Sequence, residues 1–233
     1  MEVKQFRYAS DNLGYLVHAQ GKGIAIDAGA PGEMADYCRN QDIEILYVTN
    51  THTHGDHTSG NQALLEKTGA EFLDCRQFSQ GQIIALSSGQ ELEVLLTPGH
   101  TMDSVCFKGD GFVITGDTLF NATVGNCFSG DLDAFYNSLK QLMALPGDTR
   151  VFAGHDYVEA ALQEAVSIEP GNPDIDGYRA AIGKEPVVST IADELKVNPY
   201  IRFNAPTIVQ LLKERNLPSH TGAERFTALM EVF

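Results

Sequence analysis

A short polar stretch at residues 51–61, reading THTHGDHTSGN, carries several side chains that can bind a metal ion. His52, His54, Asp56 and His57 form the pattern His-x-His-x-Asp-His. Imidazole nitrogens and carboxylate oxygens are the ligands that divalent first-row metals prefer, and one loop can direct all four to one place. The alternative, that these residues only cap turns in a solvated loop, does not account for their density. The stretch therefore predicts a metal site.

Three further motifs add ligands of the same types, each after an apolar run that reads as a strand. They are Thr-Pro-Gly-His ending at His100, Gly-Asp ending at Asp117, and Gly-His ending at His155. Glycine or proline beside each candidate permits a sharp turn and close approach of the backbone. A lone His or Asp at a strand end is usually satisfied by hydrogen bonds, so each motif alone is weak. Together, however, the motifs hold five of the seven histidines of the chain.

The seven candidate ligands divide into two groups, and one residue can belong to both. Three neutral imidazoles make a zinc site of the catalytic kind, with a position left open for water or substrate. We therefore expect two divalent ions, with Zn preferred and Fe or Mn as alternatives. Such a pair would polarise a carbonyl oxygen and generate hydroxide at neutral pH. The expected sets are His52, His54 and His100 for one ion, Asp56, His57 and His155 for the other, and Asp117 bridging both.

The hydrophobic pattern shows which elements would position these residues. Alternating or β-branched apolar runs predict strands at 3–8, 14–19, 23–27, 43–48, 71–74, 82–86, 92–96, 104–107, 111–115 and 149–153. Helices are predicted at 33–40, 61–68, from Asp131 to the stop at Pro146-Gly147, and at 158–168, 178–182, 192–197, 207–215 and 223–232. No strand is predicted after residue 157. The order favours a sheet-built catalytic domain at 1–157 followed by a helical subdomain at 158–233.

Composition limits the function classes. The 233 residues are 43 % hydrophobic and 20 % charged, as in an ordinary globular protein with one core. The net charge of −15 argues against a nucleic-acid partner. No apolar run reaches the roughly 18 residues that span a bilayer, and the N-terminus lacks the pattern of a signal peptide. The four scattered cysteines indicate reduced thiols, and a cytoplasmic location is expected.

The motifs THTHGDH, TPGH, GD and GH, at these separations, resemble those of the metallo-β-lactamase superfamily. The resemblance is greatest to its glyoxalase II (hydroxyacylglutathione hydrolase) branch. It extends to TGDTLF at 115–120, LPGDTRVFAGHDY at 145–157, IEPGNP at 168–173 and STIADELKVNPYIR at 189–202. It implies an α/β (α+β) fold, an αββα sandwich with the site on one edge and a C-terminal helical subdomain that completes the substrate site.

The resemblance implies a hydrolase that converts an S-2-hydroxyacyl thiol to a hydroxy acid and a thiol. Hydroxide between the metals would attack the thioester carbonyl, with Asp56 as a ligand that also orients the hydroxide. A thiolate leaves readily because the pKa of its conjugate acid is about 8.5, so no separate general acid is needed. The expected partner is a small-molecule thioester, with no nucleic acid and no membrane, and the expected state is a monomer or homodimer.

The substrate-binding positions depart from the family pattern. Glyoxalase II enzymes hold glutathione with a basic residue and a tyrosine, where this sequence has Asn126 and Phe128; Tyr157 does match. The final six residues, ALMEVF, contain no Lys or Arg. Each lost charge-assisted hydrogen bond is worth roughly 1.5–3 kcal/mol, so altered recognition of glutathione is expected. A second departure is Asp103-Ser104 after TPGHT, where glycine is usual.

Other functions stay open at this point. A related persulfide dioxygenase would use a single iron held by His52 or a neighbour, His100 and Asp117. A lactonase would act on an ester of similar geometry. The chain could also be a non-catalytic, metal-stabilised binding module, although its complete ligand set argues against this. A nuclease is disfavoured by the acidic charge, and a class B lactamase by the symmetric ligand set.

Overall fold

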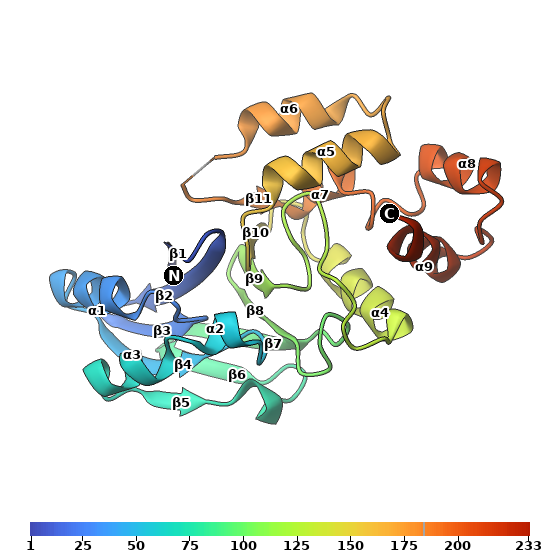
Figure 1. Cartoon of the computed structure of the whole chain (residues 1–233). Coiled ribbons are helices and arrows are strands. Elements are labelled where there is room, and N and C mark those ends of the chain that lie inside the picture. The colour runs from blue at the N-terminus through green and yellow to red at the C-terminus, as the bar shows by residue number, and fades with distance from the viewer. Residues whose placement is uncertain (184) are drawn as a thin grey trace.

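The computed structural model (Figure 1) describes residues 1–183 and 185–233 and shows two facing β-sheets. The first, sheet A, has the strand order β1 (Glu2–Tyr8), β2 (Asn12–Ala19), β3 (Lys22–Ile26), β4 (Glu44–Thr49), β5 (Glu71–Leu73). The second, sheet B, has the order β11 (Ser189–Thr190), β10 (Arg150–Ala153), β9 (Phe112–Gly116), β8 (Val105–Gly109), β7 (Gln90–Leu96), β6 (Ile83–Ser87).

Helices cover the outer face of each sheet. Sheet A carries α1 (Pro31–Asn40) and α3 (Asn61–Thr68), with the short α2 (Gly55–Thr58) and the 3₁₀ turn η1 (Cys75–Gln77) in its connections. On sheet B, α4 (Leu132–Met143) and α7 (Ile191–Val197) pack on the outer face, α9 (Gly222–Val232) packs against α4, and α8 (Pro206–Glu214) packs against α9. Helices α5 (Val158–Ile168) and α6 (Asp174–Ala181) pack beside α7. The expected αββα sandwich with C-terminal helices is therefore confirmed.

The strands separate three apolar layers because successive side chains point to opposite faces. On β2, Tyr15 lies in the core between the sheets, whereas Leu16 lies in the core under α1. On β9, Phe112 faces the inter-sheet core and Val113 faces the core under α4 and the C-terminal helices. All four side chains are fully buried. This alternation fixes which face of each strand enters which apolar layer.

The two sheets are joined by backbone hydrogen bonds at one edge of the sandwich. Leu13 N donates to Gly154 O at 2.8 Å, which connects β2 of sheet A to the end of β10 in sheet B. Val105 N donates to Thr51 O at 2.8 Å, which connects the start of β8 to the loop after β4. The predicted ligand motifs follow β4, β7, β9 and β10, and therefore all reach this edge.

Local signals at the helix ends agree with the sequence. Asp131 caps α4 by accepting a hydrogen bond from Ala134 N at 2.8 Å. Gly69 ends α3 in the left-handed region, with φ of 69°, where glycine carries no steric penalty. In the described chain, no helix has the length and hydropathy needed to cross a membrane. Cys38, Cys75, Cys106 and Cys127 are free thiols, as expected.

Two element predictions need correction. The expectation of no strand after residue 157 is wrong, because Ser189 and Thr190 form β11, which pairs antiparallel with β10. The strand is only two residues long and polar, and Thr190 also caps α7 through a capping box with Asp193. No alternating pattern of apolar residues therefore predicts this strand. Helix α6 begins at Asp174 rather than at residue 178. Its start is marked by the acidic residues Asp174 and Asp176, which stabilise a helix N-terminus, and not by the spacing of apolar residues.

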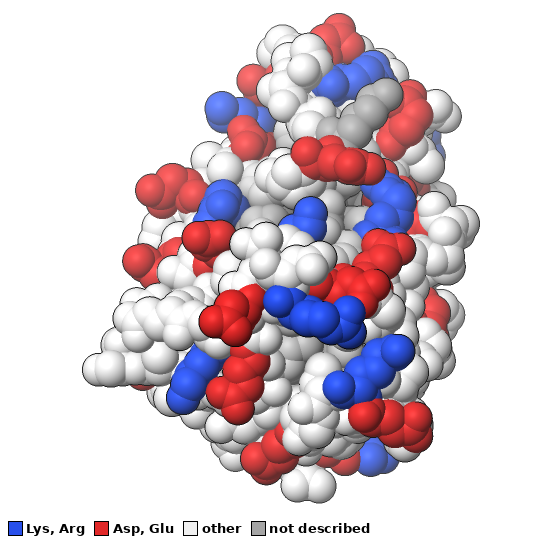
Figure 2. Space-filling model, turned by 90° about the vertical axis from the view of Figure 1, so that its left-hand side faces the viewer, with Lys and Arg blue, Asp and Glu red and all other residues white. Residues whose placement is uncertain are grey.

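The surface charge is mixed on the face of the molecule that carries β1 and α1. Figure 2 shows Lys and Arg side chains interleaved with Asp and Glu side chains over this face. Among the residues described there, the basic groups do not merge into a continuous patch. This face therefore offers no extended surface for neutralising a run of phosphates.

Candidate metal centre

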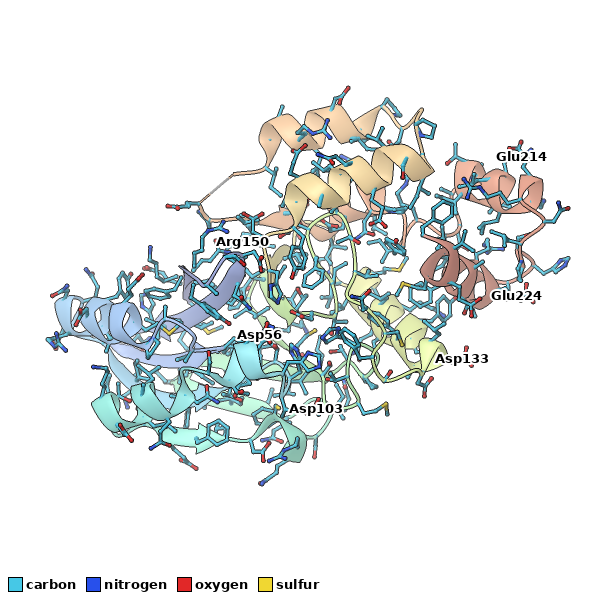
Figure 3. The ribbon with its side chains drawn as sticks, in the orientation of Figure 1. Asp56, Asp103, Asp133, Arg150, Glu214 and Glu224 are labelled. Atoms are coloured by element: carbon cyan, nitrogen blue, oxygen red, sulfur yellow. The ribbon has the colours of Figure 1, made fainter. Side chains whose placement is uncertain are left out.

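The structure brings all seven predicted metal ligands together at the edge where the sheets meet. Figure 3 shows Asp56 on α2 pointing to this edge. The candidate ligand atoms within each group lie within 4.8 Å of one another. The groups are His52, His54, His100 and Asp117, and Asp56, His57 and His155.

Asp117 lies between the two groups. Its Oδ2 is 3.4 Å from His100 Nε2 and 3.5 Å from His155 Nε2, and its Oδ1 is 3.3 Å from His57 Nε2. One carboxylate thus faces imidazoles of both groups. This is the position that a bridging ligand requires.

The facing atoms fit a cation better than they fit one another. His54 Nδ1 lies 3.0 Å from His52 Nε2 and 3.1 Å from His100 Nε2, which approximates the ligand–ligand spacing of about 3.3 Å around a tetrahedral zinc. Asp117 Oδ1 is buried and accepts no hydrogen bond. A buried carboxylate oxygen without a donor is costly unless it is paired with a positive charge. The donor set therefore fits divalent metal ions.

The outward nitrogen of each of three ligand imidazoles faces an oxygen, which directs its Nε2 to the centre. Such contacts fix the tautomer and the ring orientation of a metal-binding histidine. They are His57 Nδ1 with Asp27 Oδ2 at 2.9 Å, His155 Nδ1 with Asp11 Oδ1 at 2.8 Å, and His100 Nδ1 with the backbone oxygen of Asn126 at 2.8 Å.

Asp27 is the most heavily used of these supporting residues. It is fully buried and also accepts hydrogen bonds from Thr51 N at 2.8 Å and Thr51 Oγ1 at 2.7 Å. Burial alone would lower the pKa of His57, but the Asp27 and Asp117 carboxylates raise it to about 11. The same charges would strengthen His57 Nε2 as a metal ligand. In the sequence Asp27 is only the last residue of a predicted strand.

Asn12 is a second supporting residue that sequence reasoning missed. Its Nδ2 donates to Asp56 Oδ2 at 2.9 Å and lies 3.4 Å from His155 Nε2. It comes from the Ser-Asp-Asn turn at 10–12, which the sequence identified only as a turn. It is the first residue of β2 and forms an isolated bridge with His155, a long-range contact for which the sequence carries no signal.

Two imidazoles of the first group, those of His52 and His100, are suited to bind as neutral ligands. Burial and the nearby His57 charge lower the pKa of His52 to about 4, and burial also lowers the pKa of His100. Burial alone would raise the pKa of Asp117, but the neighbouring His155 and His57 hold it well below its ordinary range. At neutral pH His52 and His100 therefore present unprotonated nitrogens to an anionic carboxylate.

Two glycines allow this close packing. A Cβ added at Gly154 would overlap Asp117 Oδ1, and one added at Gly125 would overlap the Asp117 backbone oxygen and crowd His100. Larger residues at either position would displace the bridging carboxylate. The glycine next to His155 thus serves close approach, as the sequence indicated.

The unusual Asp103 connects two of the ligand loops. Its Oδ2 accepts a hydrogen bond from Thr53 Oγ1 at 2.5 Å and its Oδ1 from Thr101 Oγ1 at 2.6 Å. Thr53 lies between His52 and His54, and Thr101 follows His100. The second departure from the family pattern therefore reaches the site.

The predicted substrate residues surround the centre. Phe128 lies edge-on to His54 and His100, with ring centroids 5.5 and 5.2 Å away, and is 66 % exposed. The ring of Tyr157 stacks on His155 at 4.9 Å, and its pKa is raised to about 12 by burial and nearby carboxylates. The Asn126 side chain is exposed, while its backbone oxygen contacts His100.

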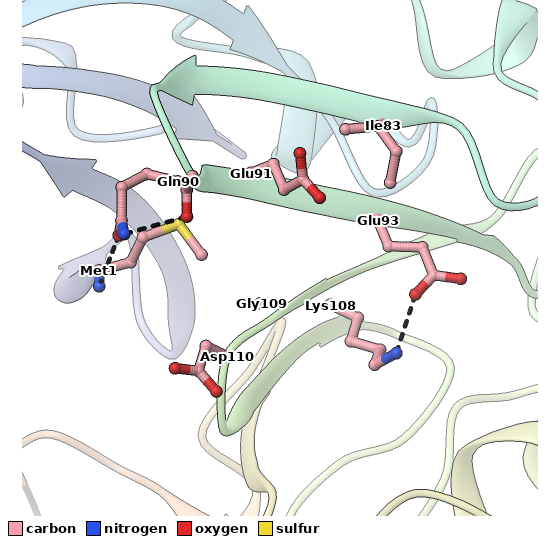
Figure 4. Close-up of a pocket in the computed structure, with 9 residues that line it drawn as sticks. Met1, Ile83, Gln90, Glu91, Glu93, Lys108, Gly109 and Asp110 are labelled. Atoms are coloured by element: carbon pink, nitrogen blue, oxygen red, sulfur yellow. Dashed lines mark hydrogen bonds and ion pairs between the residues drawn. The ribbon is translucent and has the colours of Figure 1, made fainter.

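A groove at the opposite end of β7 does not take part in this site. Figure 4 shows it around Gln90, Glu93 and Lys108, with Lys108 Nζ 2.8 Å from Glu93 Oε2. It lies at the start of β7 and at the β8–β9 turn, whereas His100 and Asp117 follow the far ends of β7 and β9. Its only lysine is already paired, so the groove adds no chemistry to the ligand edge.

Family comparisons divide the chain in two. The family described as "Metallo-beta-lactamase superfamily" matches residues 10–71 and 77–155. The family described as "Hydroxyacylglutathione hydrolase C-terminus" matches residues 156–232.

Curated relatives match along most of their length. A protein of Maricaulis maris (strain MCS10) named hydroxyacylglutathione hydrolase is 34 % identical over 229 residues, covering 88 % of each chain. Another of that name, from Methylococcus capsulatus, is also 34 % identical and covers 89 % of each chain. A third, from Polaromonas sp. (strain JS666), is 33 % identical and covers 95 % of this chain and 94 % of its own.

Solved structures share the fold at lower identity. ETHE1 from Myxococcus xanthus has a TM-score of 0.73 and 24 % identity, covering all of this chain and 91 % of its own. The BLEG-1 B3 metallo-β-lactamase has a TM-score of 0.66 and 17 % identity, covering 86 % and 99 %. These likenesses describe the fold, whereas the curated relatives carry the closer sequence match.

Proposed function

We propose, on the premise that this chain belongs to the metallo-β-lactamase superfamily and to its hydroxyacylglutathione hydrolase family, that it hydrolyses a thioester. The reaction converts an S-2-hydroxyacyl thiol and water to a hydroxy acid and a thiol. The observation that supports this most strongly is the pair of ligand groups bridged by Asp117. We propose that the groups hold two divalent ions, with Zn preferred and Fe or Mn as alternatives.

Bound ions would lower the pKa of a water and polarise the thioester carbonyl. The chain's own residues would position the reactants. Asp56 accepts a hydrogen bond from Asn12 at 2.9 Å, which aims its carboxylate at the centre, where it would orient the attacking water. Tyr157 retains its proton at neutral pH and would donate a hydrogen bond to the substrate.

The leaving thiolate needs no proton from the protein, because the pKa of a free thiol is about 8.5. This agrees with the site, in which the nearby acidic side chains Asp56 and Asp117 both have lowered pKa values. Burial opposes ionisation of both, but neighbouring imidazoles outweigh it. Both are therefore carboxylates that bind and orient, and neither is a proton donor.

We also propose that glutathione is recognised differently from the family pattern. Asn126 and Phe128 present no positive charge at the positions where the family has a basic residue and a tyrosine. The two carboxylates of glutathione would therefore lack charge-assisted partners there. The cytoplasmic location and the monomeric or homodimeric state stay predictions.

A mononuclear iron dioxygenase is supported less well. It needs only three ligands, such as His52, His100 and Asp117, and would leave Asp56, His57 and His155 without a role. These three residues instead have supporting partners of their own in Asn12, Asp27 and Asp11. A non-catalytic binding module would likewise leave the second group unexplained.

Thioester hydrolysis by the metal-loaded protein tests the proposal. S-lactoylglutathione and a small S-lactoyl thioester would be compared, with oxygen uptake in the presence of a persulfide measured in parallel. We expect the wild type to hydrolyse the small thioester. The rate of hydrolysis should fall by a factor of at least 100 in His52→Ala and stay unchanged in the exposed control His220→Ala. A His52→Ala variant with unchanged rate, or oxygen uptake without thioester hydrolysis, would refute the mechanism.

A further inference from the structure

The Tyr8 hydroxyl is a buried polar group beside the metal centre that the proposed reaction leaves unused. Among the residues that the structure describes, none forms a hydrogen bond with Tyr8 Oη. A buried hydroxyl without a partner lowers stability unless ligand binding supplies one. We propose that Tyr8 is a positioning residue whose hydroxyl donates a hydrogen bond to the Asp56 carboxylate when the second ligand group holds its ion. The inference rests on the two ions of the proposed function and adds a residue that sets the affinity for one of them.

The pairing of β1 with β2 directs Tyr8 to the second ligand group. Tyr8 is the last residue of β1 and pairs directly with Asn12, the first residue of β2. Residues directly opposite each other in an antiparallel pair point to the same face of the sheet. Asn12 Nδ2 donates to Asp56 Oδ2 at 2.9 Å. The Tyr8 side chain therefore shares the face that Asn12 presents to Asp56.

Two glycines bring the ring of Tyr8 and the helix of Asp56 to the same short segment. A Cβ added at Gly29 would overlap the Tyr8 ring. A Cβ added at Gly60, in the turn after α2, would overlap the backbone oxygen of Ala28. The Tyr8 ring and the turn after α2 thus both pack closely on residues 28–29. These contacts place Tyr8 next to α2, which carries Asp56.

The surroundings of the hydroxyl are rich in carboxylates. Burial raises the pKa of Tyr8 above its ordinary value, and the negative charges of three carboxylates act in the same direction. They belong to Asp27, Asp56 and Asp117. The Asn12 amide lies beside the hydroxyl and opposes the shift, but it already donates to Asp56. The hydroxyl therefore keeps its proton at neutral pH and is a donor among acceptors.

Asp56 is the ligand that needs a further donor. Its side chain is 46 % exposed, whereas His57 and His155 of the same group are buried. Its Oδ2 lies 3.6 Å from His57 Nε2 and 3.4 Å from His155 Nε2. A carboxylate that binds a metal is itself held by hydrogen bonds from neighbouring groups. An ion held by these three residues would draw the Asp56 carboxylate inward, and the buried Tyr8 hydroxyl supplies a donor for it.

Zinc binding tests the role of Tyr8 directly. Titration with Zn²⁺ against a chromophoric chelator gives an affinity for each ion, and the variants His155→Ala and His54→Ala assign the affinities to the two groups. Tyr8→Phe removes only the hydroxyl. We expect it to weaken binding at the second group at least tenfold and to leave the first group unchanged. Tyr37→Phe, on α1 against the same apolar layer, is the control and should change neither affinity.

Ultraviolet absorption reports on the hydrogen bond itself. The chain has no tryptophan and Zn²⁺ does not absorb, so the near-ultraviolet band is dominated by tyrosine. A phenol that donates a hydrogen bond to a carboxylate absorbs at longer wavelength than one without an acceptor. We expect this shift in the wild type and in Tyr37→Phe as the second group fills, and no shift in Tyr8→Phe.

Urea unfolding after chelation separates this role from a purely structural one. Loss of an unpartnered buried hydroxyl should leave the urea midpoint of Tyr8→Phe equal to that of the wild type or higher. A lower midpoint together with weaker binding at both groups would show a structural role and overturn the proposal. Unchanged binding at the second group, no ultraviolet shift in the wild type, or a wild type that binds only one ion would also overturn it. If the expected pattern is seen but no thioester is hydrolysed, the proposed reaction fails and the role of Tyr8 holds.

Discussion

At the scale of single residues, the ligands are held by partners from other parts of the chain. Asp27 fixes His57, Asp11 fixes His155, and Asp103 ties the loop of His52 and His54 to the loop of His100. These contacts decide how far each ligand has to move when a metal binds. A preorganised set binds more tightly because less motion is lost on binding.

Replacing Asp103 tests this preorganisation. Asp103→Ala removes the hydrogen bonds from Thr53 and Thr101 and frees two ligand loops relative to each other. We expect the affinity for the first-group metal to fall by about tenfold, the lower end of the effect of losing a supporting partner. Competition with a chromophoric chelator measures it. The exposed Asp110→Ala on the β8–β9 turn is the control, and equal affinity in both variants would contradict the role of Asp103.

The ligands could be predicted from the sequence because each of them lies in a short local motif of metal-binding residue types. Their partners could not. Asn12 and Asp56 are 44 residues apart, and Asp27 and His57 are 30 apart, so no local pattern joins them. Asn12 in a turn and Asp27 at a strand end are also ordinary residues for those places. Asn12 and Asp27 contact the metal ligands only because the fold brings distant segments of the chain together.

At the scale of elements, the loop from Asp117 to Phe128 depends on the C-terminal helices. Glu194 on α7 is fully buried and accepts a hydrogen bond from Ala122 N at 2.8 Å and one from the Tyr178 hydroxyl at 2.9 Å. The helices themselves could be predicted from apolar spacing. The hydrogen bond that connects them to this loop could not be predicted, because it depends on one polar residue, Glu194, which lies 72 positions from Ala122 in the chain.

The buried Glu194 predicts a pH-dependent contribution to stability. Burial raises its pKa from 4.5 to about 7, although its hydrogen bonds oppose the shift. The folded state therefore binds a proton that the unfolded state releases, so this contribution is complete below pH 4.5 and is lost as the pH rises to about 7. The shift corresponds to about 3 kcal/mol of unfolding free energy.

Urea unfolding of metal-loaded wild type and Glu194→Gln at several pH values measures this contribution. The wild type should lose about 3 kcal/mol relative to the variant between pH 4.5 and 7 and nothing further above that. Glu231→Gln, exposed on α9, serves as the control and should show no such trend. A pH-independent difference between wild type and Glu194→Gln would show that Glu194 acts only through its neutral hydrogen bonds.

At the scale of the whole molecule, the metal centre lies across the two sheets. His52 and His57 follow β4 of sheet A, whereas His100, Asp117 and His155 follow strands of sheet B. The edge is otherwise joined by a few backbone hydrogen bonds, such as Leu13 N to Gly154 O and Val105 N to Thr51 O. The apolar core between the sheets lies further inside. Bound metal would therefore hold the two sheets together at one edge of the sandwich.

Removal of the metal should lower stability without unfolding the chain, because the three apolar layers remain. A ligand at a thousand times its dissociation constant stabilises by about 4 kcal/mol, and each kcal/mol shifts the Tm of a chain this size by about 2–4 °C. We expect chelation to lower the Tm by about 10 °C. Hydrogen exchange should rise in residues 51–58 and 97–101 and stay slow in β2 and β9, which lie in the inter-sheet core. His220→Ala should keep the full shift, whereas His155→Ala should reduce it. An unchanged Tm after chelation, with the loss of metal verified, would mean that the centre binds metal without joining the sheets.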